Sequence, residues 1–260
     1  MTALATHSAH LTWRSVRALL RNPGYLAITL VQPVMWLFLF GQLFKKVVEV
    51  PGFATGGMSY LEFLTPGVVA MTALFSAAWA GTVYIEDMGR GVMDRLLASP
   101  VSRGAMMNGT LLYQSLTCVV QTTIIVGLAY AAGARFAGGP TGVLLTLAAA
   151  VLLTVVFAAL SNAVALLVRQ QEALIGISQL LSLPLAFLSS AMMDTRLSPA
   201  WIQTAARYNP MDWAVVVSRQ ALSADPDWAA VWARLGALVA AALLLGWLAT
   251  RAFTAYQRSS

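Results

Sequence analysis

The sequence predicts an all-α polytopic membrane protein, a chain that crosses the bilayer several times as helices. Five stretches of more than twenty residues contain no Asp, Glu, Lys or Arg; they cover residues 22–44, 63–85, 104–134, 136–168 and 173–193. A helix needs about 20 predominantly apolar residues to cross a bilayer, and a charge at its centre costs roughly 3 kcal/mol. The chain is 59% hydrophobic and only 10% charged, which leaves too few charges to solvate the surface of a soluble protein.

A sixth span fits between Trp228 and Thr250, where the only charged residue is Arg234, near one end. An arginine at that depth can lay its aliphatic stem along apolar surface while its head group reaches the interface. We therefore expect six transmembrane helices, and with their loops they make the chain a single transmembrane domain of residues 1–260. The expected spans cover about 25–43, 64–85, 105–131, 143–168, 173–192 and 230–250.

Residues 10–22, before the first span, have the pattern of an amphipathic interfacial helix. Arg14, Arg17 and Arg21 are three and four residues apart, so they share one face, and apolar residues occupy the other. Such a helix can lie in the headgroup layer of the membrane. The alternative is a plain extension of the first span that carries orientation signals. The sequence Asn-Pro-Gly at residues 22–24 favours two separate segments.

The loop between the second and third spans, residues 86–103, combines both signs of charge with apolar residues and a Ser-Pro near its end. This pattern predicts a short helix that runs across the membrane face and stops near Pro100. A solvated turn is the alternative, but it would not require the alternating Leu and Met. We interpret the segment as a docking surface whose charged residues are Glu86, Asp87, Arg90, Asp94 and Arg95.

Two short helices are expected between the fifth and sixth spans. The pieces on either side of Asn209 and Pro210 are each about ten residues long, too short to cross the bilayer. Asn209 suits the N-cap of the second helix and Pro210 its first position. Four amphipathic aromatics typical of a membrane interface also lie here: Trp201, Tyr208, Trp213 and Trp228. We expect both helices to lie on, or dip into, the outer leaflet.

The distribution of charge predicts that both termini are cytoplasmic in a multi-pass protein of the cell membrane. With six spans, the side that holds the termini carries nine of the sixteen basic residues and four of the ten acidic ones. The cytoplasmic side of a membrane protein is normally enriched in Lys and Arg. Lys45 and Lys46, after the first span, count against this orientation.

The residues exclude several function classes. A phosphate-binding P-loop needs a Gly-Lys pair, and the only lysines, Lys45 and Lys46, follow Phe44. The five uncharged runs contain no Asp, Glu or His that could relay protons or hold a metal, and both histidines lie in the N-terminal tail. We therefore predict no catalytic residue, no metal and no cofactor in this chain. Nucleic-acid binding is disfavoured because the basic residues flank apolar runs.

Three segments of the chain resemble permease subunits of the type-2 ABC transporter family, most closely the daunorubicin-resistance-like drug exporters. They are YLEFLTPGVVAMTALF at 60–75, RLLASPVSR at 95–103 and LSPAWIQTAARYNPMDWAVVVSRQAL at 197–222. The resemblance covers nearly the whole chain, and the outer Asn-Pro with Arg219 downstream is its more specific part.

The resemblance implies a half-transporter. A second permease copy, in a homodimer, or else a related chain would complete the membrane part, and two separate ABC ATPase subunits would bind the ATP and Mg. Glu86, Asp87, Arg90, Asp94 and Arg95 would then form the coupling helix on the ATPase. Arg14, Arg17 and Arg21 would belong to a connecting helix beside it, and Asn209, Pro210 and Arg219 to helices that cap the exit.

The candidate substrate path rests on polar and aromatic residues within the spans. Such polar residues ordinarily make hydrogen bonds between helices, worth about 0.6 kcal/mol each. Phe75 and Trp79 are four residues apart and share a helix face, although packing against lipid or protein is the alternative. The resemblance implies that the second and fifth helices face the central cavity, which selects Phe75, Trp79, Gln179, Ser182 and Phe187.

The expected function is export of a hydrophobic or amphipathic, drug- or antibiotic-like compound, with ATP hydrolysed by a separate subunit. Two alternatives remain open from the residues. One is export of a polysaccharide or lipid-linked glycan by the same architecture, and the other is a motor-free membrane channel or scaffold.

Overall fold

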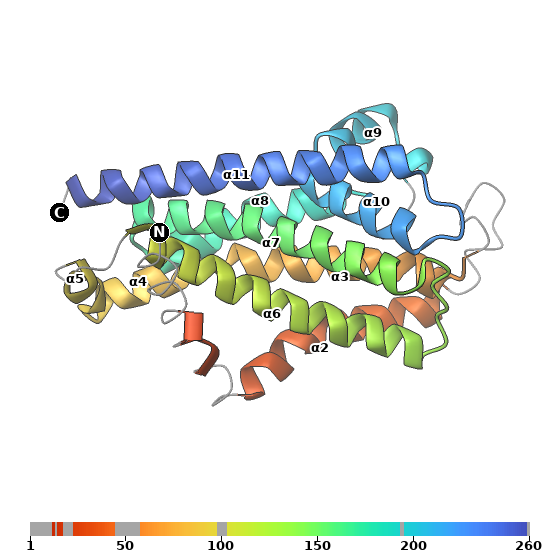
Figure 1. The fold of residues 1–260 in the computed structure, drawn as a ribbon, viewed down its shortest axis with the longest axis horizontal. Coiled ribbons are helices and arrows are strands. Elements are labelled where there is room, and N and C mark those ends of the chain that lie inside the picture. Colours follow the sequence, from red (N-terminus) through yellow and green to blue (C-terminus); the bar gives the residue numbers. More distant parts are fainter. Residues whose placement is uncertain are drawn as a thin grey trace.

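The computed structural model describes residues 12–13, 15–17, 23–44, 58–97, 103–192 and 195–258, and in these residues the protein is helical (Figure 1). The N-terminal half contains α2 (Pro23–Leu43), α3 (Tyr60–Ala78), α4 (Thr82–Gly89), α5 (Val92–Leu97) and α6 (Arg103–Ala131). The C-terminal half contains α7 (Gly139–Val168), α8 (Gln171–Phe187), η2 (Thr195–Leu197), α9 (Ala200–Arg207), α10 (Pro210–Leu222) and α11 (Trp228–Arg258).

The helices confirm a polytopic all-α membrane protein. Four helical segments are long and apolar enough to cross a bilayer: Tyr60–Gly89, Gly104–Ala131, Gly139–Val168 and Trp228–Phe253. Two shorter helices, α2 and α8, accompany them; α2 is apolar over Ala27–Leu43, and α8 has 17 residues. Each of the six predicted spans overlaps one of these segments. The long helices run along a common axis (Figure 1).

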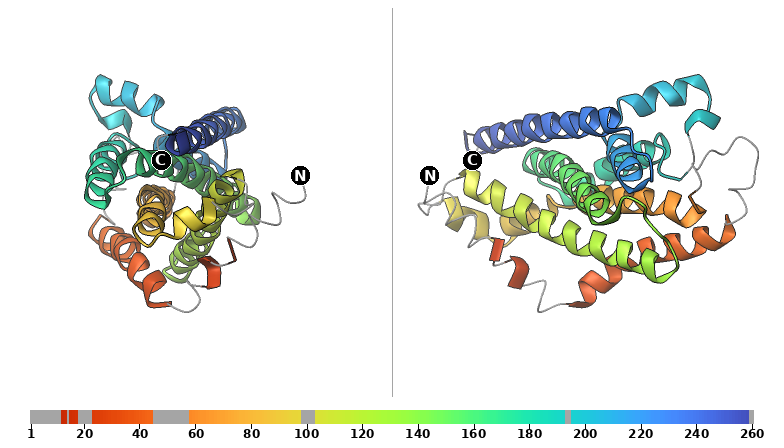
Figure 2. Two further views of the ribbon diagram at one scale, coloured as in Figure 1. Left: turned by 90° about the vertical axis from the view of Figure 1, so that its left-hand side faces the viewer. Right: turned by 45° about the vertical axis from the view of Figure 1, so that its right-hand side comes forward.

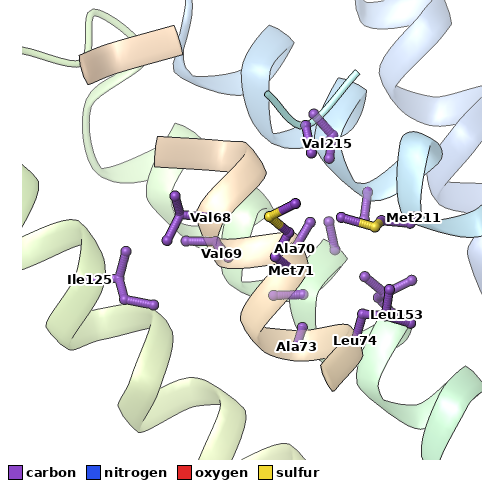
Figure 3. Close-up of a cluster of buried hydrophobic side chains, with 14 of the residues drawn as sticks. Val68, Val69, Ala70, Met71, Ala73, Leu74, Ile125, Leu153, Met211 and Val215 are labelled. Carbon is purple, nitrogen blue, oxygen red and sulfur yellow. The ribbon is translucent and has the colours of Figure 1, made fainter. Parts of the chain in front are cut away.

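α3 lies at the centre of the bundle, surrounded by α2, α6, α7, α8 and α10 (Figure 2). Its side chains are buried on all faces from Phe63 to Leu74, as expected for a helix that is apolar all round. Figure 3 shows these side chains meeting Ile125 of α6, Leu153 of α7 and Met211 of α10.

A capping box starts α3. The Ser59 hydroxyl accepts the Glu62 N–H at 3.3 Å, and the Glu62 carboxylate accepts the Ser59 N–H at 2.8 Å. Two of the N–H groups that a helix start leaves without an intrahelical partner are thereby satisfied. The chain therefore enters the bundle at a defined residue.

The two short helices before α11 differ in depth. α10 packs against α3, α7 and α11, with Asp212, Val215 and Ser218 buried. α9 lies at the tip of the molecule, where Trp201 is 64% exposed (Figure 2). The sequence left open whether the two short helices lie on the outside or dip inward. In the structure α10 is packed into the bundle, and α9 lies on the outside of the bundle.

The two ends of the bundle carry different elements. α5 and the C-terminal end of α11 lie at one end, and α9 lies at the opposite end (Figure 1). Residues 12–13 and 15–17 are helical and lie near the α5 end, where the Thr12 hydroxyl donates to the Gly109 carbonyl of α6 at 3.3 Å. Arg14 and Arg21, two of the three arginines predicted for this helix, lie outside the described residues.

Candidate functional site

A cleft of about 590 Å³ opens between α2, α3 and α8, with α4 and α6 closing parts of its wall. α2 contributes Thr29, Gln32, Pro33 and Trp36; α3 contributes Val68, Met71, Thr72, Phe75 and Ser76. The remaining lining residues are Trp79, Thr82, Glu86, Gln121, Gln171, Gln179 and Leu183. The wall therefore combines amide and hydroxyl groups with three large aromatic rings.

The cleft runs from the α5 end of the bundle into its middle. Glu86 and Val68 both line it, and they lie 18 residues apart in a largely helical segment. At about 1.5 Å per residue this segment extends roughly 27 Å, close to the thickness of the hydrocarbon core. The lining residues therefore extend along much of α3 and into α4.

The structure brings together three of the five predicted path residues. Phe75, Trp79 and Gln179 line the cleft. Ser182 is 2% exposed and lies instead at a small cavity of about 20 Å³ beside Ala78. Phe187 is 70% exposed and lies one helical turn beyond Leu183, the last cleft residue of α8.

The placement of Ser182 follows from the geometry of α8. Ser178 and Ser182 are four residues apart on one stripe of the helix, and the Ser178 hydroxyl donates to the Ala78 carbonyl at 2.8 Å. Gln179 and Leu183 form the neighbouring stripe, which faces the cleft. The prediction placed residues of both stripes in one path, whereas only one stripe lines it.

The sequence prediction missed the contribution of α2 and α6. Thr29, Gln32 and Trp36 recur at spacings of three and four in an otherwise apolar helix, which places them on one face. That spacing is a signal in the sequence itself. Gln121 of α6 donates its amide N–H to the Thr29 hydroxyl at 3.1 Å, so the two helices are joined at the cleft wall.

A break separates α3 from α4 at Trp79–Gly81, next to the cleft. The Ala78 carbonyl accepts hydrogen bonds from Ser161 Oγ at 2.7 Å and Ser178 Oγ at 2.8 Å. The N–H of Gly81 donates to Ser161 Oγ at 3.0 Å. Backbone groups that leave a helix inside the membrane need replacement partners, and two serines of α7 and α8 supply them.

The charged segment that follows the break is exposed. Arg90 and Glu86 form an ion pair of 3.4 Å between side chains that are 72% and 48% exposed. Arg95 is also exposed, while the side chain of Asp94 lies outside the described residues. Of the predicted charged residues whose side chains are described, Glu86, Arg90 and Arg95 are exposed at one end of the bundle and Asp87 is half-buried.

The apolar side of this segment packs within the chain. Met93 of α5 is 1% exposed and belongs to a cluster with Tyr84, Met107 and Phe253. The expectation that the apolar residues form a docking surface is therefore wrong at Met93. The reason is that α5 packs against the ends of α6 and α11, so Met93 fills a core while Arg95 remains exposed.

Polar contacts tie α4 to its neighbours. The Tyr84 hydroxyl lies 3.1 Å from the Thr110 hydroxyl of α6. Asn162 of α7 donates to the same Thr110 oxygen at 3.1 Å. Thr110 therefore links α4, α6 and α7 through hydrogen bonds.

At the opposite end, Asn209 holds the exit of α8 and the start of α10. Its amide donates to the carbonyls of Leu185 at 2.7 Å and Leu188 at 2.9 Å, and its oxygen accepts the Met211 N–H at 3.0 Å. Pro210 occupies the first turn of α10, where its missing N–H is not needed.

Arg219 of α10 joins three segments. Its guanidinium donates to the carbonyls of Phe63 at 3.3 Å and Ser190 at 2.8 Å and lies 3.8 Å from the centre of the Phe63 ring. Asp212, two turns earlier, accepts the Ser190 N–H at 2.7 Å. Two charged side chains of α10 therefore bind the turn after α8, and Arg219 also binds α3.

Together these features are those of a membrane transport protein: a multi-pass helical bundle, a cleft between its helices, and an exposed charged elbow formed by α4 and α5 at one end of that cleft. Comparison with known proteins gives the family. Residues 7–223 match the family of ABC-2 type transporters, so the chain belongs to that family.

Three relatives illustrate the match. A daunorubicin resistance ABC transporter permease protein of Streptomyces coeruleorubidus is 30% identical over 84% of this chain and 75% of its own length. A probable doxorubicin resistance ABC transporter permease protein of Mycobacterium tuberculosis is 25% identical over 68% and 65%. Nodulation protein J of Rhizobium leguminosarum bv. trifolii is 25% identical over 84% and 79%. The chain is therefore a membrane permease subunit of the ABC-2 type and not itself the ATPase.

Proposed function

We propose that two copies of this chain form the membrane part of an ATP-driven exporter, with a separate ABC ATPase subunit docked on each, that moves amphipathic drug-like compounds out of the cell. The observation that best supports this proposal is that the cleft extends to Glu86, beside the exposed charges of α4 and α5. Movement of this elbow by an ATPase would act directly on a wall of the cleft.

The cleft chemistry supports a drug-sized cargo. Its volume of about 590 Å³ lies within the range of pockets that bury small organic ligands, roughly 300–1,000 Å³. Trp36, Phe75 and Trp79 offer planar apolar surface, and the glutamines offer hydrogen bonds. Relatives described as daunorubicin and doxorubicin resistance permeases point to the same kind of cargo.

A second candidate cargo is a glycan or lipid-linked glycan. Amide side chains next to tryptophans suit sugars, and Gln32, Gln121, Gln171 and Gln179 share the cleft with Trp36 and Trp79. The cleft volume favours the smaller cargo. Uptake of labelled glycans and of daunorubicin by the same vesicles separates the two.

The energy source is proposed to be a partner subunit that binds ATP and Mg. The chain carries no Gly-Lys pair and hence no P-loop. We expect an ABC ATPase to copurify with the tagged chain, and inside-out vesicles with both proteins to accumulate daunorubicin only with hydrolysable ATP. ATP hydrolysis by the purified chain alone would contradict the proposal. Arg95→Glu should abolish ATP-dependent uptake while leaving the melting temperature of the chain unchanged, because Arg95 is exposed.

The second copy is proposed to cover the open side of the cleft. α2 and α8 both line the cleft and flank α3 on one side of the bundle (Figure 2). Both helices carry exposed apolar residues: Met35 of α2 is 54% exposed and Leu180 of α8 is 73% exposed. Cysteines at these two positions should cross-link two chains in membranes. Leu144→Cys, 65% exposed on α7, is the control for contacts with lipid.

The α5 end is proposed to be cytoplasmic. An engineered cysteine at Arg95 should react with a membrane-impermeant maleimide only in inside-out vesicles, and one at Tyr208 only in intact cells. Tyr208 is 78% exposed at the opposite end, and the native Cys118 is buried and will not interfere. Labelling of Arg95→Cys in intact cells would contradict the orientation and the docking of an ATPase at this elbow.

A further inference from the structure

Gln121 of α6 differs from the other residues of the cleft because its side-chain amide N–H has a hydrogen-bond partner and its carbonyl oxygen has none among the described residues. Its side chain is 1% exposed, and its N–H donates to the Thr29 hydroxyl of α2 at 3.1 Å. Its carbonyl oxygen is buried and has no hydrogen-bond partner within the described part of the chain. The same residue lines the cleft.

A buried acceptor without a partner is uncommon in proteins because it has lost water and gained nothing in exchange. Asn162 has a comparable unpaired amide oxygen, but it lies among α4, α6 and α7 and lines no part of the cleft. Gln121 instead belongs to the wall of a cavity large enough for a ligand. The Thr29 contact holds the amide in place, so its orientation does not depend on the ligand.

The charges around the cleft select the sign of a ligand. Among its described lining residues Glu86 is acidic and none is basic. Trp36, Phe75 and Trp79 present aromatic rings, whose faces attract cations. Arg90 pairs with Glu86 at 3.4 Å but does not line the cleft, so an anion would meet no basic side chain among the described lining residues.

We propose that Gln121 is a specificity-determining residue, whose carbonyl oxygen accepts a hydrogen bond from an N–H group of a planar organic cation held in the cleft by the aromatic rings. The inference deepens the proposed export function by naming the class of cargo and the residue that reads it. It concerns binding to the permease itself and needs neither ATP nor the partner ATPase.

Two dyes provide a matched pair of probes. Rhodamine 123 and tetramethylrhodamine methyl ester are both singly charged planar cations with a methyl ester. The first carries N–H groups on its ring system, and the second has methyl groups in their place. Fluorescein provides an anion of similar shape. Binding is measured by fluorescence anisotropy with the full chain in phosphatidylcholine nanodiscs, against empty nanodiscs.

We expect rhodamine 123 to bind the wild-type chain about tenfold more tightly than the methylated dye, which is the value of one good hydrogen bond, and fluorescein not to compete. Gln121→Leu should abolish this preference through loss of rhodamine 123 affinity while the methylated dye binds as before. Gln121→Glu, which keeps an acceptor, should retain the preference. Gln114→Leu on the same helix but outside the cleft should change neither affinity.

Equal affinities for the two cations in the wild-type chain, an equal loss of both in Gln121→Leu, competition by fluorescein, or no dye binding at all would each overturn the inference. Retained binding of the methylated dye shows that Gln121→Leu is folded. Failure of ATP-dependent export with Gln121-dependent binding intact would instead contradict the proposed function alone.

Discussion

Ser161 of α7 accepts the backbone N–H of Gly81 at 3.0 Å and, with the same oxygen, donates to the carbonyl on the other side of the break between α3 and α4 at 2.7 Å. One hydroxyl therefore closes both ends of an interrupted membrane helix. The interruption lies within the wall of the cleft, between the lining residues of α3 and those of α4.

Replacing Ser161 with alanine should weaken this closure. The Gly81 N–H would lose its partner, and the Ala78 carbonyl would keep only Ser178. We expect a loss of about 2 kcal/mol in the free energy of unfolding, because a buried donor is left unsatisfied. Thermal unfolding in detergent measures it, with Ser115→Ala as control, since the Ser115 hydroxyl binds only the carbonyl of Leu111 in its own helix. Equal stability of the two variants would contradict the role of Ser161.

Gly81 is required for its size and not for its backbone angle, which is an ordinary φ of −69°. A Cβ at this position would lie 2.5 Å from the Ser161 carbonyl oxygen and 2.7 Å from the Ala165 Cβ. Gly81→Ala should therefore push α4 away from α7 and destabilise the protein by about 1–3 kcal/mol.

The matched control for Gly81 is Gly89→Ala at the end of α4, where a Cβ would meet nothing within 4 Å. This change should leave the melting temperature unchanged or raise it slightly, because alanine favours helix. Equal melting temperatures of Gly81→Ala and Gly89→Ala in detergent would contradict the view that Gly81 is needed for close packing of α4 on α7.

The sequence predicts the long apolar helices well because a membrane leaves such segments little choice. Twenty apolar residues without charge have to form a helix, and the ends of such runs are marked by charge. The start of α10 was equally predictable, since capping by Asn209 and Pro210 depends on residues next to each other.

Features that depend on distant partners could not be predicted. The break at Trp79–Gly81 contains no proline, and the serines that close it lie 80 and 100 residues away along the chain. The division of α8 into a cleft stripe with Gln179 and a packing stripe with Ser182 depends on which neighbour each face meets. Helix periodicity shows which residues share a stripe of α8, but it does not show which neighbouring helix or cavity each stripe contacts.

The depth of α10 depends on two glycines of another helix segment. A Cβ at Gly138 or Gly142 would collide with the carbonyl oxygen of Ala221, and the Gly138 N–H donates to the Leu222 carbonyl at 3.2 Å. Small residues allow such close approach of helices in membranes. Gly142→Ala should force α10 outward and cost about 1–3 kcal/mol.

Gly127→Ala on α6 is the control for Gly142→Ala, because a Cβ at Gly127 would meet nothing within 4 Å. The pair is compared by thermal unfolding and by protease sensitivity of the loop that follows α10. Similar unfolding of both variants would indicate that α10 does not depend on this contact.

Arg219 should be irreplaceable by lysine although the charge is kept. One terminal nitrogen of its guanidinium donates to the carbonyls of both Phe63 and Ser190, and the guanidinium lies 3.8 Å from the Phe63 ring centre; a lysine ammonium has no planar group to stack on that ring. We expect Arg219→Lys to lose roughly 1–2 kcal/mol and Arg219→Leu roughly 2–3 kcal/mol, from the lost charged hydrogen bonds and cation–π contact.

Arg234→Leu on α11 provides the comparison for Arg219, because Arg234 binds only the Ala230 carbonyl of its own helix at 3.4 Å. Its stability should change by less than 1 kcal/mol. Because Arg219 joins α3 to the turn after α8, its loss should also increase the reactivity of a cysteine placed at Ser190, which is 5% exposed in the intact fold. Unchanged reactivity at that position, together with unchanged unfolding, would mean that the turn after α8 is held by Asp212 and Asn209 without Arg219.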